Sequence, residues 1–379
     1  MENRKSICFI VSSPMTAEAF LRNHFKVLKD HFEVFLIANF PLNYKFNKIN
    51  LKRENIIHIE IIREINFYTD FKTILKLNRI FKKYKFDIVH SITPKAGLIA
   101  SVVGFISKRP IRIHHFTGQV WANKRGVFDV FLRYLDKLIS NLTTHILVDG
   151  NSQLEFLIKN NILNPNKAQV LGNGSISGVD LEKFKPNIRT KLFIREKYKI
   201  EEETIVFIFM GRLKKDKGVL DLVNAFIKLS KDFSSRELSL FFVGPDEENI
   251  KFLINTSSIK ASINFIDFTS TPELYLQLGD VFCLPSYREG FGTSVIEASA
   301  LELPVICSDI YGLKDAFKNN KTGLSFKVKD VEDLKNKMSI LIKNPKKIKQ
   351  FGENGSIFVK EKYSSNLVSN CLLNFYQQL

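Results

Sequence analysis

The sequence predicts an α/β protein built from two doubly wound domains, and three observations support this fold class. The chain has 379 residues, which is more than one hydrophobic core comfortably accommodates. Short apolar runs alternate with longer segments of helical periodicity, the pattern of a parallel sheet covered by helices. A glycine-rich stretch at 168–187, with Pro186 near its end, has the composition of a loop that runs into a linker.

Strand-like and helix-like segments follow one another through the first half of the chain. We expect strands at 6–13, 33–39, 55–62, 87–92, 111–116 and 144–150. Helices are expected at 17–31, 70–85, 95–107 and 128–142. In the second half, an apolar run at 204–213 predicts a strand, and 218–230 carries apolar residues at helical spacing. From about residue 344 the chain is helical and basic, and 367–379 is amphipathic.

The composition is that of a globular protein. Hydrophobic residues make up 45% of the chain, and no run reaches the ~18 apolar residues needed to span a bilayer. The apolar stretch at 7–11 is too short for the core of a signal peptide. The four cysteines are scattered without the paired spacing of a zinc site or a disulfide framework, which fits a reducing cytoplasm.

The basic excess belongs entirely to the first half of the chain. Residues 1–200 hold 33 Lys and Arg against 16 Asp and Glu, whereas residues 201–379 hold 23 against 23. A solvated surface, a nucleic-acid face and attraction to an anionic membrane are the alternatives, but no nucleic-acid-binding signature is present. An apolar stripe accompanies the excess, with Arg133 and Lys137 toward its other side, and either core packing or membrane contact explains it. The stripe comprises Phe128, Phe131, Leu132, Leu135, Leu138, Ile139 and Leu142.

The segment at 286–306 carries the strongest chemical signal. Glu289 opens a Gly-Phe-Gly loop between two apolar runs, and Glu297 lies about one turn into the helix that follows, which Thr293 or Ser294 is expected to cap. A helix start after a glycine-rich loop suits a phosphate, and a carboxylate one turn later can accept hydrogen bonds from a ribose diol. A plain strand–turn–helix with a solvated Glu297 is the alternative.

A second candidate loop, GRLKKDKG at 211–218, leaves the carboxyl end of a predicted strand. Doubly wound sheets bind ligands at that edge. Arg212 offers a planar fork of donors and Lys217 a point charge, which together suit a diphosphate. Alone, the loop is more typical of a solvated charged turn, but the glutamate segment downstream favours the diphosphate interpretation.

These segments resemble the motifs of retaining glycosyltransferases of family 4, which have the GT-B fold. The Glu-x7-Glu pattern, GRLKKDKG, VGPDEE at 243–248 and the run at 272–286 follow in family order and cover most of 205–325. The resemblance implies two Rossmann-like domains facing each other across a cleft. We expect an acceptor-binding domain at 1–186, a nucleotide-sugar-binding domain at 187–360, and a final helix at 361–379 that crosses back to the first domain.

The resemblance also implies roles for individual residues. Glu289 lies by the donor sugar, Glu297 holds the nucleotide ribose, and Arg212 and Lys217 bind the diphosphate. Glu289, Arg212 and Lys217 are therefore the expected catalytic residues. The further donor-binding residues expected from the motifs are Gly290, Phe291, Gly292, Thr293 and Gly244.

The first domain is expected to recognise the acceptor, and its signals are weaker. Many relatives carry a histidine directly before the glycine that follows the third strand-like run. This chain has Thr117 there, with His114 and His115 just upstream. A threonine hydroxyl cannot act as a base at neutral pH. Two lysines, Lys95 and Lys124, are candidates for acceptor phosphates together with Arg125, and Trp121 is a candidate for sugar or lipid contact.

The expected reaction is the transfer of a sugar from a nucleotide sugar, with retention at the anomeric carbon. The expected donor is a UDP-sugar such as UDP-GalNAc or UDP-GlcNAc, with no metal and no cofactor. The expected acceptor is an undecaprenyl-diphosphate-linked glycan of bacterial surface polysaccharide synthesis, such as capsule or O-antigen. The enzyme is expected to be cytoplasmic and peripheral at the inner face of the cell membrane, without a nucleic-acid partner. A sugar-nucleotide epimerase of the same fold and a non-enzymatic basic module remain the alternatives.

Overall fold

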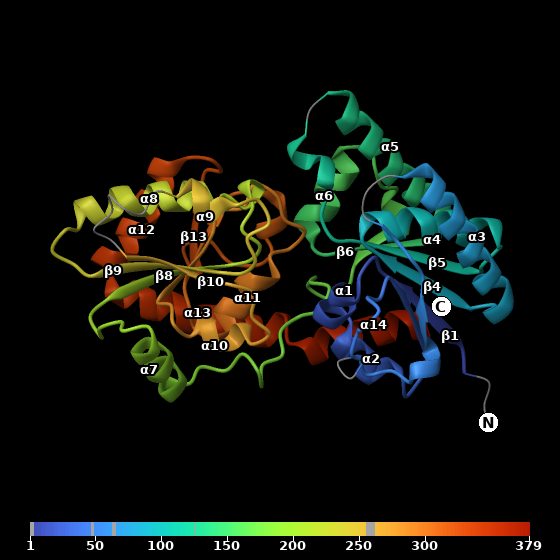
Figure 1. Ribbon diagram of the computed structural model, residues 1–379, viewed down its shortest axis with the longest axis horizontal. Helices are drawn as coiled ribbons and strands as arrows, with labels where there is room; N and C mark the ends of the chain where they lie inside the picture. The colour runs from blue at the N-terminus through green and yellow to red at the C-terminus, as the bar shows by residue number, and fades with distance from the viewer. Residues whose placement is uncertain (1–3, 47–48, 63–65, 125, 255–261) are drawn as a thin grey trace. The chain divides into compact units, whose positions relative to one another are not determined.

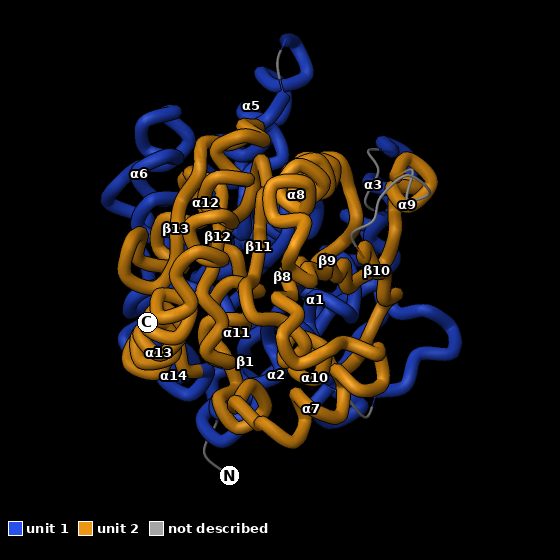
Figure 2. Tube along the Cα trace, turned by 90° about the vertical axis from the view of Figure 1, so that its left-hand side faces the viewer, with its two compact units in different colours: residues 1–178, 365–379 blue, residues 179–364 orange. Residues whose placement is uncertain are grey.

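The computed structural model describes residues 4–46, 49–62, 66–124, 126–254 and 262–379. The chain divides into two compact units, one of residues 1–178 with 365–379 and one of residues 179–364 (Figure 2). Each unit is a parallel sheet with helices on both faces, so the predicted α/β class with two Rossmann-like domains is confirmed. Nothing in the described ranges combines the length and apolar character of a membrane-spanning helix.

The first unit contains a seven-stranded sheet in the order β3-β2-β1-β4-β5-β6-β7 (Figure 1). Its strands are β1 (Ser6–Ile10), β2 (Glu33–Ala38), β3 (Ile56–His58), β4 (Ile88–Ile92), β5 (Ile111–Phe116), β6 (His145–Val148) and β7 (Ala168–Val170). Its helices are α1 (Pro14–Phe20), α2 (Arg22–Leu28), α3 (Phe67–Tyr84), α4 (Pro94–Ile106), α5 (Val127–Leu142), α6 (Asn151–Lys159) and α14 (Ser365–Gln377).

Alternation along the central strand β1 explains why both faces of this sheet are covered. Ile7 and Phe9 point into a core shared with α2 and α14, whereas Cys8 and Ile10 point into a core shared with α3 and α4. Successive side chains of a strand face opposite sides, and a continuous apolar run therefore needs helices on both. The last helix, α14, packs on α2 and completes the first of these cores with Tyr376.

The second unit contains a six-stranded sheet in the order β10-β9-β8-β11-β12-β13, again with every paired strand parallel. Its strands are β8 (Ile205–Met210), β9 (Leu238–Val243), β10 (Ser262–Ile266), β11 (Val281–Leu284), β12 (Val305–Ser308) and β13 (Gly323–Phe326). Its helices are α7 (Ile188–Lys197), α8 (Val219–Asp232), α9 (Ile250–Leu253), α10 (Pro272–Leu276), α11 (Thr293–Ala300), α12 (Val331–Lys343) and α13 (Pro345–Lys362).

The boundary between the units lies at Gly178 rather than at the expected residue 186. The amide of Val179 donates to the carbonyl of Tyr363 at 2.7 Å, and Phe184 lies in the core of the second unit. These contacts attach 179–186 to the second unit, although the glycine- and proline-rich composition resembled a free linker. The short strand β7, within the stretch expected to be a loop, was also missed.

Candidate functional site

Three loops of the second unit meet at the carboxyl edge of its sheet. The loops follow β8, β9 and β11, and β8 lies between the other two strands in the sheet. Backbone hydrogen bonds join them: the Leu213 amide donates to the Pro245 carbonyl at 2.8 Å, and the Tyr287 amide to the Asp216 carbonyl at 2.9 Å. Parallel strands end on one side, so residues far apart in the sequence form one surface here.

Two glycines make this close approach of the loops possible. Gly244 has a φ of 141°, and a Cβ there would lie 2.1 Å from the carbonyl oxygen of Gly211. Gly218, which begins α8 with a φ of 67°, would place a Cβ 2.1 Å from the carbonyl oxygen of Pro285. Both positions therefore require glycine for conformational and for steric reasons. The α8 helix begins at this junction without a side-chain cap.

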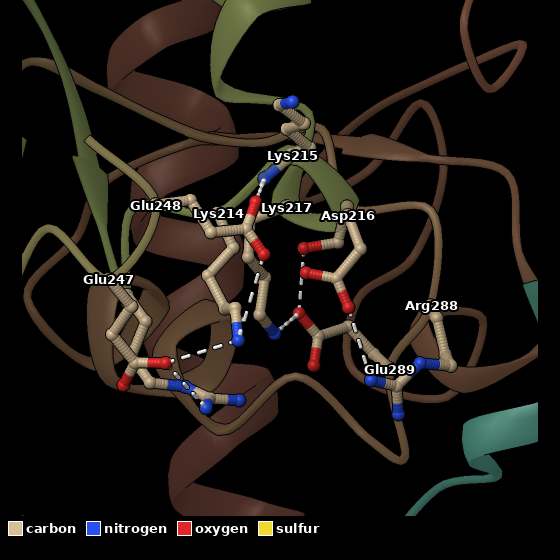
Figure 3. A network of polar contacts seen from close by, with 10 residues as sticks. Lys214, Lys215, Asp216, Lys217, Glu247, Glu248, Arg288 and Glu289 are labelled. Carbon is tan, nitrogen blue, oxygen red and sulfur yellow. Dashed lines mark hydrogen bonds and ion pairs between the residues drawn. The ribbon is translucent and has the colours of Figure 1, made fainter. Parts of the chain in front are cut away.

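The ammonium of Lys217 contacts the carboxylate of Glu289 at the centre of the site, with Nζ and Oε1 2.5 Å apart (Figure 3). Both side chains are about one-sixth exposed, at 16% and 15%. The hydroxyl of Ser286 also donates to Glu289 Oε1, at 2.7 Å. The structure thus brings together two of the three expected catalytic residues, which lie 72 positions apart in the sequence.

The third expected catalytic residue, Arg212, belongs to a second group of charges on the same loops. Its guanidinium lies 3.2 Å from Oε2 of Glu247, which also accepts from Lys214 Nζ at 3.2 Å. Glu248 accepts from the backbone amide of Lys215 at 2.8 Å. Figure 3 shows these carboxylates and cations facing one another across the loops that follow β8 and β9. Three cations, Arg212, Lys214 and Lys217, therefore gather where the loops converge.

The Gly-Phe-Gly loop differs in detail from the expectation. The α11 helix begins at Gly292, which has a φ of 80°, and neither Thr293 nor Ser294 caps it, so the predicted cap is wrong. Because a glycine caps the helix, its first amides are not satisfied by a side chain. Phe291 is 3% exposed and packs its ring on Tyr363, 5.2 Å between centroids, so its side chain is a core residue.

Glu297 is half-buried within the first turns of α11. Its pKa is raised from 4.5 to about 7, chiefly by loss of solvent, with Lys183 opposing the shift and the carboxylate of Glu273 adding to it. Lys183 and Glu273 are themselves paired at 3.0 Å. A carboxyl that changes its charge near neutral pH suits the recognition of hydroxyl groups, since its ionised form accepts two hydrogen bonds.

Comparison with known proteins identifies the fold family of both units. Residues 17–182 match the model for Glycosyltransferase Family 4, and residues 190–357 match the model for Glycosyl transferases group 1. The chain is 34% identical over 328 residues to the capsular polysaccharide biosynthesis glycosyltransferase CapM of Staphylococcus aureus, covering 84% of this chain and 83% of that protein. The chain belongs to glycosyltransferase family 4.

Other relatives of this glycosyltransferase act on lipid-linked sugars according to their names. One is the UDP-Gal:α-D-GlcNAc-diphosphoundecaprenol α-1,3-galactosyltransferase of Escherichia coli, 28% identical over 73% of this chain and 71% of that protein. Among solved structures, sucrose-phosphate synthase from Thermosynechococcus elongatus superimposes with a TM-score of 0.81 at 18% identity over 99% of both chains. That likeness confirms the GT-B fold. The transferase interpretation is accordingly favoured over the epimerase and the basic module.

The two histidines expected on the acceptor side of the glycosyltransferase lie in the interior of its first unit. His114 is bonded to Ser91 Oγ at 2.9 Å, and burial, together with a smaller effect of His115, lowers its pKa to about 3. His115 lies 3.0 Å from Asp149, with both side chains less than one-tenth exposed. The His114 imidazole is enclosed, whereas the His115 imidazole lines a small pocket together with His24 and His90.

The remaining acceptor-side candidates of the glycosyltransferase divide into paired and exposed residues. Lys95 is largely buried and contacts Asp70 at 2.5 Å, so its charge is already balanced, whereas Lys124 is exposed and Thr117 half-exposed. Arg125 lies outside the described residues. The prediction for Trp121 is wrong, because its indole is 1% exposed and donates to Asp136 at 2.7 Å.

Four polar residues of the donor-side loops were not singled out from the sequence. Lys214 lies within the quoted GRLKKDKG motif, and Glu247 lies within VGPDEE, but the motif alone does not say that they contact each other. Ser286 and Arg288 flank Glu289, and Arg288 pairs with Asp216 at 3.1 Å. Charges of opposite sign on the loops after neighbouring strands were the sequence signal that could have predicted these contacts.

Proposed function

We propose that this glycosyltransferase transfers a hexosyl or N-acetylhexosaminyl group from a UDP-sugar, with retention of configuration and without a metal ion. The single observation that carries the proposal is the contact of Lys217 with Glu289 at 2.5 Å beside Arg212 and Lys214. A carboxylate and a group of cations on converging loops suit a sugar diphosphate, with the carboxylate toward the sugar hydroxyls and the cations toward the phosphates.

In the proposed reaction, the bond between the anomeric carbon and the diphosphate oxygen breaks as the acceptor hydroxyl approaches from the same face. The new glycosidic bond forms there, and the hydroxyl proton passes to the departing phosphate oxygen. Negative charge grows on the diphosphate, and Arg212, Lys214 and Lys217 stabilise it by fixed electrostatics. Glu289 orients the sugar hydroxyls, and Glu297 accepts from the ribose diol. The cations thereby take the part that a divalent ion plays in metal-dependent transferases.

The proposed acceptor is a glycan linked to undecaprenyl diphosphate, used in the synthesis of a bacterial surface polysaccharide. The Escherichia coli relative and a Campylobacter jejuni relative, 26% identical over 93% of this chain, both carry a diphospho-undecaprenol acceptor in their names. A solved GT-B structure of Anabaena HepE contains UDP and glucose, which supports a uridine donor. We propose that the protein works from the cytoplasm, at the anionic inner face of the membrane.

The donor site is tested by calorimetric titration of UDP, GDP and ADP into the wild type, Glu297→Ala and Glu289→Ala. We expect selective UDP binding that weakens in Glu297→Ala and is retained in Glu289→Ala. Turnover of a UDP-sugar should fall at least ~100-fold in Glu289→Ala, the usual cost of one group that stabilises the transition state. It should persist in excess chelator. Undiminished turnover by Glu289→Ala, or no preference among nucleotides, contradicts the proposal.

A further inference from the structure

Three neighbouring helices cover one face of the first unit's sheet, and α4 packs between α3 and α5 (Figure 1). The α3 and α5 helices have 18 and 16 residues, or about 27 and 24 Å, whereas β4 has 5 residues, or about 17 Å. Both helices end just before the next strand begins, so their excess length lies at their first turns. These turns therefore project beyond the carboxyl edge of the sheet.

The projecting turns carry large apolar side chains that face solvent. On α3, Phe67 is 81% exposed, and on α5, Val127 is 88% exposed. The same turns and the ones after them also expose Tyr68, Phe71, Leu75, Phe128, Val130, Phe131 and Tyr134. Single exposed apolar residues are ordinary, but a group on two projecting helix ends of one sheet face marks an interaction surface. We call this group the aromatic tip.

The stripe expected on α5 is thus divided between two roles. Its last part packs inside, since Ile139 is 1% exposed, whereas Phe128 and Phe131 belong to the aromatic tip. The apolar periodicity of the sequence could not separate these roles, because it does not reveal that α5 is longer than the strands that it covers. The contribution of α3 was not expected from the sequence at all.

A cation row, Lys72 and Lys76, lies beside the aromatic tip, and further exposed cations follow toward the other ends of α3 and α5. The carboxylates of α3 and α5 are already engaged: Asp70 with Lys95, Asp129 with Arg133, and Asp136 with Trp121. Six exposed cations of these helices make no ion pair with any described residue, namely Lys72, Lys76, Arg79, Lys82, Lys83 and Lys137. Phe67, Phe71 and Leu75 recur every four residues along α3, and Lys72 and Lys76 form the adjacent row at the same spacing.

We propose that the aromatic tip inserts into the interfacial region of an anionic phospholipid bilayer while the cation row contacts the lipid phosphates. Aromatic side chains favour the boundary between headgroups and acyl chains. Long lysines keep their charge in water while their stems cover apolar surface, and each strengthens binding to an anionic leaflet about fivefold. This surface rests on the lipid-linked acceptor of the proposed function and names which part of the enzyme meets the membrane. A basic surface for nucleic acid alone does not call for projecting aliphatic residues such as Val127 and Val130.

The test is flotation of the full chain with vesicles containing phosphatidylglycerol, compared with vesicles of phosphatidylcholine alone. We expect the wild type to float with the anionic vesicles. The variant Phe67→Ser/Phe71→Ser/Phe128→Ser/Phe131→Ser should lose about 100-fold in partitioning. Lys72→Glu/Lys76→Glu should lose at least about 25-fold on anionic vesicles and little on neutral ones. The matched control is Phe193→Ser/Phe252→Ser/Phe268→Ser, three exposed aromatic residues of the second unit, which should float like the wild type.

Calorimetric UDP binding reports on folding and separates the two proposals. If all variants bind UDP and the aromatic-tip variant floats as well as the wild type, the surface assignment is overturned while the donor site stands. Loss of flotation in the second-unit control overturns it as well. If the aromatic-tip variant changes the oligomeric state of the protein instead of its flotation, the surface joins two protein copies and the proposal fails. Flotation without UDP binding by the wild type leaves the membrane surface standing and removes the donor site.

Discussion

At the scale of single residues, Glu247 competes with the proposed substrate. Its carboxylate lies 3.2 Å from both Arg212 and Lys214, the cations that we propose to bind the diphosphate. A diphosphate must therefore displace Glu247 before it gains the two cations. All three side chains are about one-quarter to two-fifths exposed, so the ion pairs are weak and the displacement is easy.

We predict that Glu247→Gln strengthens UDP binding about three- to fivefold, because an amide holds a guanidinium less tightly than a carboxylate does. Calorimetry of UDP and of uridine measures the effect, and uridine, which lacks phosphates, should bind both proteins equally. Glu237→Gln, at an exposed carboxylate just before β9, is the control. Weaker UDP binding by Glu247→Gln would mean that Glu247 positions Arg212 instead of competing for it.

The proposed contact of Glu297 with the ribose makes donor binding depend on pH. Burial raises its pKa to about 7, so the carboxyl is mainly protonated below that pH and ionised above it. We predict that the ratio of wild-type to Glu297→Gln affinity for UDP rises from about pH 6 to about pH 8, because only the ionised form accepts from both ribose hydroxyls. The ratio removes the ionisation of the phosphates, which is common to both proteins. A ratio that stays flat across this range contradicts the ribose role.

The contribution of the same carboxyl to the free energy of unfolding falls as the pH rises. Its pKa is higher in the folded state than the ordinary 4.5, so the folded state holds a proton that the unfolded state releases between about pH 4.5 and 7. Its contribution to the free energy of unfolding is therefore full below about pH 4.5 and declines as pH rises through 7. Glu297→Gln should lack this decline. The ionised carboxylate of Glu297 therefore lowers the free energy of unfolding at neutral pH.

At this scale, the sequence predicted which loops carry the candidate residues but not which of those residues contact each other. The motifs placed Glu289 and Lys217 on loops, but their contact depends on β11 pairing with β8, which no local pattern reveals. The histidines illustrate the same limit of a local pattern. A polar residue at a strand end resembles a site residue until its partner is known, and His114 is satisfied by Ser91 from the neighbouring strand.

At the scale of secondary-structure elements, α14 completes a core of the first unit from the far end of the chain. Tyr376 is fully buried and lies against Phe9 of β1, and its hydroxyl is 2.5 Å from Nδ1 of His90 on β4. Loss of solvent lowers the pKa of His90 well below its usual value, so the ring is neutral and the hydroxyl bonds an uncharged imidazole. Through Tyr376 the helix thereby contacts both β1 and β4 at the centre of the sheet.

We predict that Tyr376→Phe lowers the free energy of unfolding by about 1–3 kcal/mol, because it leaves a buried imidazole nitrogen without its partner. Urea denaturation followed by circular dichroism measures the loss. Asn374→Ala, at an exposed position of the same helix, should change stability by less than about 0.5 kcal/mol. UDP affinity should be equal in all three proteins. A Tyr376→Phe protein as stable as the wild type would show that the bond contributes nothing.

At the scale of the whole molecule, the α/β class and the two-unit division followed from alternating strand-like and helix-like segments, since apolar runs that are buried on both faces are distinctive. The unit boundary did not follow, because residues 179–186 have the composition of a linker and are held by contacts with Phe184 and Tyr363 that composition does not encode. The basic excess was visible in the residue counts. Which cations are left unpaired beside the aromatic tip depends on which acids are already paired, and only the fold specifies that.

The return of α14 to the first unit affects how the protein forms during translation. Residues 1–178 leave the ribosome first, yet Tyr376 and its neighbours in their core are synthesised only after the whole second unit. At ordinary rates of elongation the delay is roughly 10–40 s. The second unit is contiguous and can fold while the chain grows. The first unit, in contrast, lacks part of its core until α14 has been synthesised. Chaperones that shield apolar surface on nascent chains should therefore act on the first unit of this enzyme.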